Sequence, residues 1–390
     1  MRGVLVLLFA SIALDAKVEV GSDFPGGSVV VDALDEEART LRFRPMNYKN
    51  KGWACWWSFK VSGLKPGEVW KLGLQGSNFA VPKRASVSTD AKTWKHSAPG
   101  KRSGKLQVYE IEVPAETTWF AWGPTFVLAD AKRLVENTAK AKVGAKAYVL
   151  CKSREGREVP ALRWEPEGND KQPALWIQAR QHAWEAGSSW VCRGLVEWLA
   201  SDDQAAVKLR QTARIHVVPI MDPDNVERGA GGKNQIPHDH NRDWSEHPRY
   251  PEVAAAQDWI KRLNEERDFV LFLDLHNPGP GDGKPFFFGS PDSHLNPKRK
   301  ENQKRFHEHC LNTLGKHPLG FSEKVRVTGA GYHPLWRRIS KNWVAENTAP
   351  RSVNLTLETT WNSPHSTQGG YLGYGAALGK AIALYLEATR

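Results

Sequence analysis

The first part of the chain, from residue 17 to residue 125, consists of short runs in which apolar and polar residues alternate or β-branched residues gather. Turn signals such as Gly26-Gly27, Pro66-Gly67 and Pro99-Gly100 separate these runs. Alternation with a period of two is typical of strands with one buried face, and strands at this spacing predict an all-β sandwich domain. We expect strands at residues 28–31, 40–43, 56–61, 69–74, 106–113 and 118–122.

The pattern changes at residue 145, where apolar runs of strand length begin to alternate with segments that carry apolar residues at helical spacing. This alternation predicts an α/β domain over residues 145–390, with a mainly parallel, mixed sheet and helices on both faces. A connecting segment at 126–144, helical from 128 to 142, is expected between the two domains. We expect strands at 147–151, 174–179, 215–220, 269–275 and 353–357, and helices at 188–200, 203–213, 251–266, 296–314 and 371–388.

Residues 1–16 show a third pattern, that of a secretory signal peptide. Arg2 provides a short basic start, residues 4–14 are almost all apolar, and Ala13 and Ala16 supply the small residues of a cleavage site. The apolar run is too short to span a bilayer, and no later stretch approaches its length. The sequence therefore predicts a secreted or periplasmic protein without a membrane span.

Composition is ordinary for a globular protein of two domains, with 390 residues, 40% hydrophobic and 25% charged. The formal net charge of +11 predicts an electropositive surface, which would favour acidic partners, nucleic acid or anionic membranes, although a generic basic surface is the commoner case. The basic residues are scattered and form no recognised nucleic-acid motif, so nucleic acid is not expected as a partner. The four cysteines contain no C-x-x-C pair, and one or two disulfides would be compatible with an exported protein.

Three metal-capable side chains follow two of the predicted strands. His182 and Glu185 come just after the strand at 174–179, and His276 ends the strand at 269–275. Ligands of open α/β sheets bind at the carboxyl ends of strands, so these side chains are expected to converge. Two histidines and one glutamate with an open fourth position form a catalytic zinc site. Asp274 is a candidate to support His276 from behind.

Two further stretches carry polar groups at strand ends and in loops. Glu358 follows the strand at 353–357, where its carboxylate could take a proton from an activated water. Asn241 and Arg242 lie in the long loop after the strand at 215–220. A guanidinium beside an amide is suited to bidentate recognition of a carboxylate, so this pair is a candidate substrate-binding site.

These motifs occur in the order found in zinc carboxypeptidases of the carboxypeptidase A clan. The chain most resembles their cytosolic carboxypeptidase branch, whose members carry an all-β domain directly before the catalytic domain. The resemblance implies one Zn²⁺ per chain and a peptide or protein C-terminus as the substrate. The motifs that carry it are His182-x-x-Glu185, Asp222-Pro-Asp224, Asn241-Arg242, Asp274-Leu-His276 and Leu357-Glu358.

The resemblance also assigns a role to each motif residue. His182, Glu185 and His276 would bind the zinc ion. Glu358 would be the general base that activates the attacking water and then delivers a proton to the leaving amine. Asn241 and Arg242 would hold the free carboxylate of the substrate.

The chain departs from the family at one position. An arginine that supports the developing oxyanion usually lies before the Asn-Arg pair, and a gapless comparison places Gly232 there. Lys233 and Arg228 are the candidates to replace it, and Tyr332 is a candidate for the family's mobile tyrosine. Loss of one oxyanion donor costs about a hundred- to a thousand-fold in rate, so weakened catalysis is one expectation.

The leading hypothesis is a zinc carboxypeptidase. The resemblance associates the cytosolic branch with trimming of acidic residues, and the basic charge is compatible with an acidic C-terminal residue without establishing it. Two alternatives stay open. One is a zinc amidohydrolase that acts on small N-acyl amino acids. The other is a catalytically weakened protein that binds peptide or glycan, with the aromatic residues of the β domain as its platform. Core packing is the commoner role of such aromatic residues.

Overall fold

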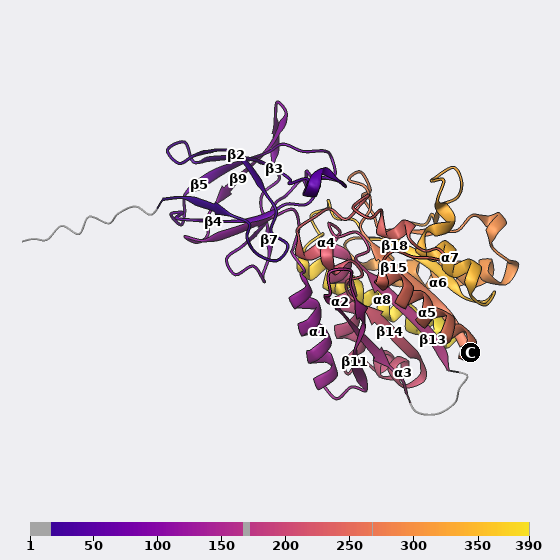
Figure 1. Cartoon of the computed structure of the whole chain (residues 1–390). Coiled ribbons are helices and arrows are strands. Elements are labelled where there is room, and N and C mark those ends of the chain that lie inside the picture. The colour runs from indigo at the N-terminus through magenta and orange to yellow at the C-terminus, as the bar shows by residue number, and fades with distance from the viewer. Residues whose placement is uncertain (1–16, 167–171, 267, 390) are drawn as a thin grey trace, which may run out of the picture.

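The computed structural model describes residues 17–166, 172–266 and 268–389, so the predicted signal peptide lies outside the described residues. Figure 1 shows the strands of the first part, in indigo and violet, as a separate layered unit beside a larger sheet that helices cover. This arrangement confirms the prediction of an all-β unit followed by an α/β unit.

The N-terminal unit is built from two five-stranded sheets, ordered β1-β4-β10-β6-β7 and β2-β3-β5-β9-β8. All pairings are antiparallel except that of β3 with β5. Aromatic side chains fill the space between the sheets, and Trp57 and Phe59 have no exposed surface. The strands are β1 (Glu19–Gly21), β2 (Val30–Asp35), β3 (Thr40–Arg44), β4 (Ser58–Ser62), β5 (Val69–Leu74), β6 (Ser86–Ser88), β7 (Lys95–His96), β8 (Lys101–Ser103), β9 (Leu106–Glu112) and β10 (Thr118–Ala121).

The second unit contains a mixed eight-stranded sheet, ordered β11-β12-β14-β13-β15-β18-β16-β17. Its four central strands, β14, β13, β15 and β18, are parallel. Strands β11 and β12 pair in antiparallel fashion with their neighbours, and β16 is antiparallel to β18 but parallel to β17. The strands are β11 (Ala145–Lys152), β12 (Glu158–Trp164), β13 (Pro173–Ala179), β14 (Arg214–Val218), β15 (Asp268–His276), β16 (Phe286–Gly289), β17 (Arg326–Val327) and β18 (Val353–Glu358).

Helices cover both faces of this sheet, as predicted. One face packs against α1 (Leu128–Lys140), α2 (Ala186–Leu199), α3 (Gln204–Thr212), α6 (Pro297–Thr313) and α8 (Gln368–Ala388). The other face packs against α5 (Pro251–Glu266) and α7 (Ser340–Asn347). Helix α1, expected as a connector, buries Ala131, Leu134 and Val135 in the same core as β13 and β14. No described helix is long and apolar enough to cross a membrane.

The sequence did not reveal several elements. Strands β1, β6, β7, β8 and β17 are only two or three residues long, too short to show alternation. Pro160 interrupts the run that forms β12, and proline argues against a strand. Helix α7 is about two turns long and offers few positions for a helical period. All four cysteines are free thiols, so the one or two disulfides that the sequence allowed are not formed.

Candidate active site

Three adjacent parallel strands, β13, β15 and β18, end at the same edge of the sheet. Ala179 pairs with Leu275, and His276 pairs with Glu358, so the last residues of the three strands lie side by side. The turn that follows β13 carries His182 and Glu185 to the same edge. Strand register therefore brings together side chains that lie far apart in the sequence.

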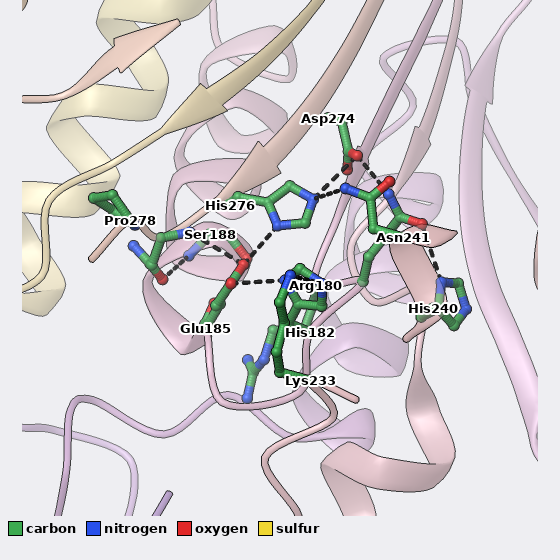
Figure 2. A network of polar contacts seen from close by, with 12 residues as sticks. Arg180, His182, Glu185, Ser188, Lys233, His240, Asn241, Asp274, His276 and Pro278 are labelled. Atoms are coloured by element: carbon green, nitrogen blue, oxygen red, sulfur yellow. Dashed lines mark hydrogen bonds and ion pairs between the residues drawn. The ribbon is translucent and has the colours of Figure 1, made fainter. Parts of the chain in front are cut away.

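His182, Glu185 and His276 form one compact group in which one ligand atom from each lies within 4.8 Å of the others. The Glu185 carboxylate lies between the two imidazoles, with Oε1 2.8 Å from His182 Nδ1 and Oε2 2.7 Å from His276 Nδ1. Figure 2 shows both rings turned toward this carboxylate. All three side chains are buried, so they are oriented by the fold rather than by solvent.

A carboxylate also contacts the outer nitrogen of each ring. His182 Nε2 is 3.0 Å from Asp239 Oδ1, and His276 Nε2 is 3.0 Å from Asp274 Oδ2. A carboxylate that accepts the Nε2 proton leaves Nδ1 as a lone pair, which is how neutral histidine binds metal. Asp274 thus lies where the sequence suggested support for His276, whereas Asp239 was not anticipated.

The charges of this group are unbalanced without a cation. Burial alone would raise the pKa of Glu185, but the two adjacent imidazoles lower it to about 2. Burial opposes protonation of His276, but Asp274 and Glu185 raise its pKa well above its ordinary value. A buried carboxylate-rich group that demands positive charge fits a divalent metal, and two nitrogens with one carboxylate fit zinc.

A small cavity of about 40 Å³ lies beside the metal-capable group. Glu358 lines it, and its Oε2 atom has no hydrogen-bond partner among the described residues. Burial, with the nearby Glu185 and Asp274 carboxylates, raises the pKa of Glu358 to about 8. The lining consists of His182, Lys233, Asn241, Arg242, His276, Phe288, Thr328, Tyr332, Ile339, Lys341, Thr356 and Glu358.

Asn241 and Arg242 belong to the short helix η2 (His240–Arg242) at the wall of this cavity. Asp239 caps η2 by accepting the Asn241 backbone N–H at 2.9 Å, so one aspartate fixes both this turn and His182. Arg242 Nη1 donates to Asn241 O at 2.7 Å, and its Nε is buried without a partner in the described chain. Guanidinium donors therefore remain for an incoming carboxylate, and Tyr332 covers them with its ring 6.0 Å from Arg242 Cζ.

Lys233 lines the cavity. The backbone at the preceding residue, Gly232, leaves no room for the arginine that the family usually carries at that position. Lys233 Nζ is 3.0 Å from Asp239 Oδ2 and 3.3 Å from His182 Nε2. Gly232 has a φ of +79°, and a Cβ there would lie 2.4 Å from the backbone nitrogen of Ala183. The close approach of the two loops thus excludes any side chain at position 232.

Arg228, the other candidate, does not join the site. Its guanidinium forms an ion pair with Glu155 and donates to Asn225 Oδ1 at 3.1 Å. Its Cζ lies 5.0 Å from the Tyr48 ring centre. Arg228 is not among the described residues that line the cavity, so the structure favours Lys233 over Arg228.

The Asp222-Pro-Asp224 motif is also structural here. Asp222 caps helix α4 (Pro223–Glu227) by accepting the Asn225 backbone N–H. Asp224 accepts from Ser153 Oγ at 2.7 Å and Arg157 Nη1 at 2.8 Å. The motif therefore shapes the loop that leads to Lys233.

Lys341 is a second residue that the sequence did not single out. Its side chain has no exposed surface, and its Nζ donates to Gly289 O at 2.9 Å, Asn342 Oδ1 at 2.7 Å and Thr328 Oγ1 at 2.5 Å. Among the described residues, no carboxylate forms an ion pair with it, and burial lowers its pKa well below the ordinary value. A single lysine in a two-turn helix gives no periodic signal in a sequence.

Comparison with known sequences places the chain in a family. The family model described as zinc carboxypeptidase matches residues 133–362. An uncharacterised protein of Zymomonas mobilis is 26% identical over 267 residues, which cover 66% of this chain and 67% of that protein. Cytosolic carboxypeptidase 3 of Mus musculus is 33% identical over 110 residues, which cover 28% of this chain and 11% of the mouse protein.

Solved structures share the fold over almost the whole chain. A metallo-carboxypeptidase from Burkholderia cenocepacia superposes with a TM-score of 0.82 at 20% identity and covers 96% of this chain and 100% of its own. A metallo-carboxypeptidase from Pseudomonas aeruginosa, solved with (2-guanidinoethylmercapto)succinic acid, superposes with a TM-score of 0.80 at 23% identity. This match covers 95% of this chain and 100% of the other. Both similarities include the N-terminal β unit as well as the α/β unit.

Proposed function

The chain belongs to the zinc carboxypeptidase family, and from this premise we propose that it removes C-terminal residues from peptides or proteins with one zinc ion per chain. The observation that carries the proposal is the convergence of His182, Glu185 and His276 beside a cavity lined by Glu358 and Arg242. Zinc bound there would act as a Lewis acid on the scissile carbonyl and acidify a water molecule.

Glu358 is the proposed general base. Glu358 lines the cavity and keeps an unpaired carboxylate oxygen, and its raised pKa suits a group that takes a proton from water and returns it to the leaving amine. Arg242 and Asn241 are the proposed ligands of the substrate's C-terminal carboxylate, because a guanidinium and an amide can hold both oxygens. Lys233 supplies a positive charge near the oxyanion, as a point charge in place of a guanidinium fork.

We further propose that the preferred C-terminal residue is acidic, and Lys341 is the support for this choice. A buried ammonium without a counter-ion is unfavourable, so an anionic side chain that enters the cavity would relieve that cost. Arg242 would then bind the main-chain carboxylate, while Lys341 would turn one of its three Nζ donors, which bond Gly289 O, Thr328 Oγ1 and Asn342 Oδ1 in the described chain, toward the side-chain carboxylate. The net charge of +11 is compatible with acidic substrates.

The test is hydrolysis of peptides that differ only in the C-terminal residue, with and without a zinc chelator. We expect cleavage that the chelator abolishes, that amidation of the C-terminus prevents, and that is fastest for peptides ending in Glu or Asp. Cleavage that survives chelation or amidation would contradict the proposal. Turnover of N-acyl amino acids alone would favour the amidohydrolase, and binding without turnover would favour the weakened binding protein.

The location of the protein is a separate proposal that rests on the signal-peptide pattern of residues 1–16. Expression with and without these residues, followed by separation of cytoplasm, periplasm and medium, tests it. Retention of the full-length chain in the cytoplasm would contradict a secreted or periplasmic location.

A further inference from the structure

We propose that Arg180 is a positioning residue that holds the turn between β13 and α2 in metal-binding geometry before any metal binds. The inference rests on the proposed function, since it concerns the same metal site. Arg180 is the first residue after β13, and it precedes His182 by two positions. Its φ of +66° lies in the left-handed region, which is costly for a residue other than glycine.

The Arg180 side chain binds the middle of the turn between β13 and α2, which is called the metal turn below because it carries His182 and Glu185. Its Nε donates to Ala183 O at 2.7 Å, and Ala183 lies between the two predicted ligands. Its Nη1 donates to Phe126 O at 3.2 Å and to Ser189 Oγ at 3.4 Å in helix α2. Figure 2 draws Arg180 beside His182 and Glu185. One guanidinium thus joins the start of the turn, its centre and the helix that follows it.

Arg180 also connects this turn to the β unit. Its Cζ lies 5.9 Å from the centre of the Trp56 ring, within the range of a cation–π contact. The Trp56 indole in turn donates to Gly26 O at 2.8 Å, so the ring is fixed within the first part of the chain. The turn is therefore held from the sheet, from α2 and from the β unit together.

A gain in folding stability does not by itself explain a buried arginine at position 180. Arg180 is only 2% exposed, and none of the described carboxylates forms an ion pair with it. Apolar residues often replace buried charges without loss of stability, so a costly guanidinium beside a metal turn points to positioning.

The test measures zinc affinity rather than turnover, by competition with a chromophoric chelator on the folded full-length chain. Arg180→Met removes the donors but keeps the length, and we expect the zinc Kd to rise about 10- to 100-fold, as for other groups behind metal ligands. Arg180→Lys keeps the charge without the fork, and we expect an intermediate Kd. If Arg180→Met does not fold, the lysine variant still decides the question.

Arg299 provides a matched control. It is 3% exposed, and its guanidinium donates to carbonyl oxygens of Ala345, Thr348, Ala349 and Ser352, away from the metal-capable group. Arg299→Met should lower the Tm of the metal-free protein and leave the zinc Kd within about two-fold.

Two results would overturn the inference. One is a wild-type Kd in both Arg180 variants, and the other is an equal rise in Kd for Arg299→Met. If the wild-type chain itself bound no zinc, the proposed function would fail and this inference with it. Normal zinc binding by the wild type and by both Arg180 variants would remove only the role of Arg180.

Discussion

At the scale of single residues, the site is governed by buried carboxylates that flank both imidazoles. Glu185 lies between the rings, while Asp239 and Asp274 accept from their outer nitrogens. Each aspartate has a second task, because Asp239 also pairs with Lys233 and Asp274 also accepts from Ser340 Oγ at 2.5 Å. Metal affinity and substrate contacts are therefore coupled through shared side chains.

Replacing Glu358 by glutamine should abolish most turnover and leave zinc bound. Glutamine keeps the shape of the side chain but cannot take a proton from water, and positioned proton transfer contributes about 10²- to 10⁴-fold. The measurements are kcat on a peptide substrate and zinc content per chain. An unchanged rate would mean that another group is the base.

Replacing Lys233 by methionine should lower kcat by about 10²- to 10³-fold, the usual effect of losing one oxyanion donor. Arg228→Met is the control, because Arg228 bonds to Glu155 and Asn225 and does not line the cavity. Steady-state kinetics of both variants on one peptide check the assignment. Equal losses in the two variants would argue against an oxyanion role for Lys233.

Replacing Lys341 by methionine should remove the preference for acidic residues. A charge-assisted hydrogen bond is worth about 1.5–3 kcal/mol, so kcat/KM for peptides ending in Glu should fall about 10- to 100-fold. Peptides ending in Leu serve as the internal control, and their kcat/KM should stay equal or rise. A parallel loss for both peptides would show that Lys341 supports the fold and not the specificity.

At the scale of elements, the decisive feature is the contact between the loop at Gly232 and the turn at Ala183. The carbonyl of Gly231 accepts the Trp184 backbone N–H at 3.0 Å, and the Trp53 N–H donates to Lys233 O at 3.1 Å. The loop that carries Lys233 is thus fixed between the metal turn and the β unit. Lys233 is therefore held beside His182, as its proposed role requires.

Gly232→Ala should therefore be more harmful than an ordinary glycine substitution. Gly144 is the matched control, since its φ is +77° and a Cβ there would meet nothing within 4 Å. Gly144→Ala should cost about 1–2 kcal/mol for the left-handed backbone alone. Gly232→Ala adds the clash with Ala183, so its free energy of unfolding should fall further and its zinc Kd should rise. Equal effects in urea unfolding would contradict the close packing.

At the scale of the whole molecule, the two units form a continuous structure around the site. Gln235 Nε2 donates to Lys51 O at 3.2 Å, and the Gly26 N–H donates to Glu227 O at 2.9 Å. Aromatic contacts also cross the boundary between the two units, since the ring centres of Trp122 and Trp184 lie 5.2 Å apart. The β unit therefore supports the loops of the active site.

Acid stability of the whole fold should depend on His216, which stacks on Trp176 in the core. Burial, with Arg163 and Arg214 nearby, lowers the pKa of His216 to about 3. The unfolded chain takes up this proton near pH 6.5 but the folded chain does not. Stability should be fully present above pH 6.5 and should fall by up to about 1.4 kcal/mol per pH unit as the pH decreases toward 3.

His216→Phe is the variant that tests this dependence. It keeps an aromatic ring beside Trp176 but loses the 3.1 Å contact of Nδ1 with Tyr148 Oη, which should give a constant offset in stability. Urea unfolding between pH 4.5 and 7 should show a flatter pH dependence for the variant than for the wild type. Parallel curves for the two proteins would remove His216 as a source of acid sensitivity.

The sequence by itself determined the two-part fold and the placement of His182, Glu185, His276 and Glu358 at strand ends. These features are local, because alternation, apolar runs and short motifs are written within about ten residues of each other. The order of the motifs added the family resemblance, which the match over residues 133–362 confirms. The short elements and Arg180 carried no comparable local signal.

Only the tertiary structure decided which polar residues share the site. Asp239 reaches His182 across 57 positions of sequence, and Lys341 reaches the cavity from a two-turn helix. Gly232 excludes a side chain only because another loop packs against it. Arg228 pairs with Glu155 instead of entering the cavity. Such outcomes depend on strand register and on contacts between distant loops, and neither is encoded in a local pattern.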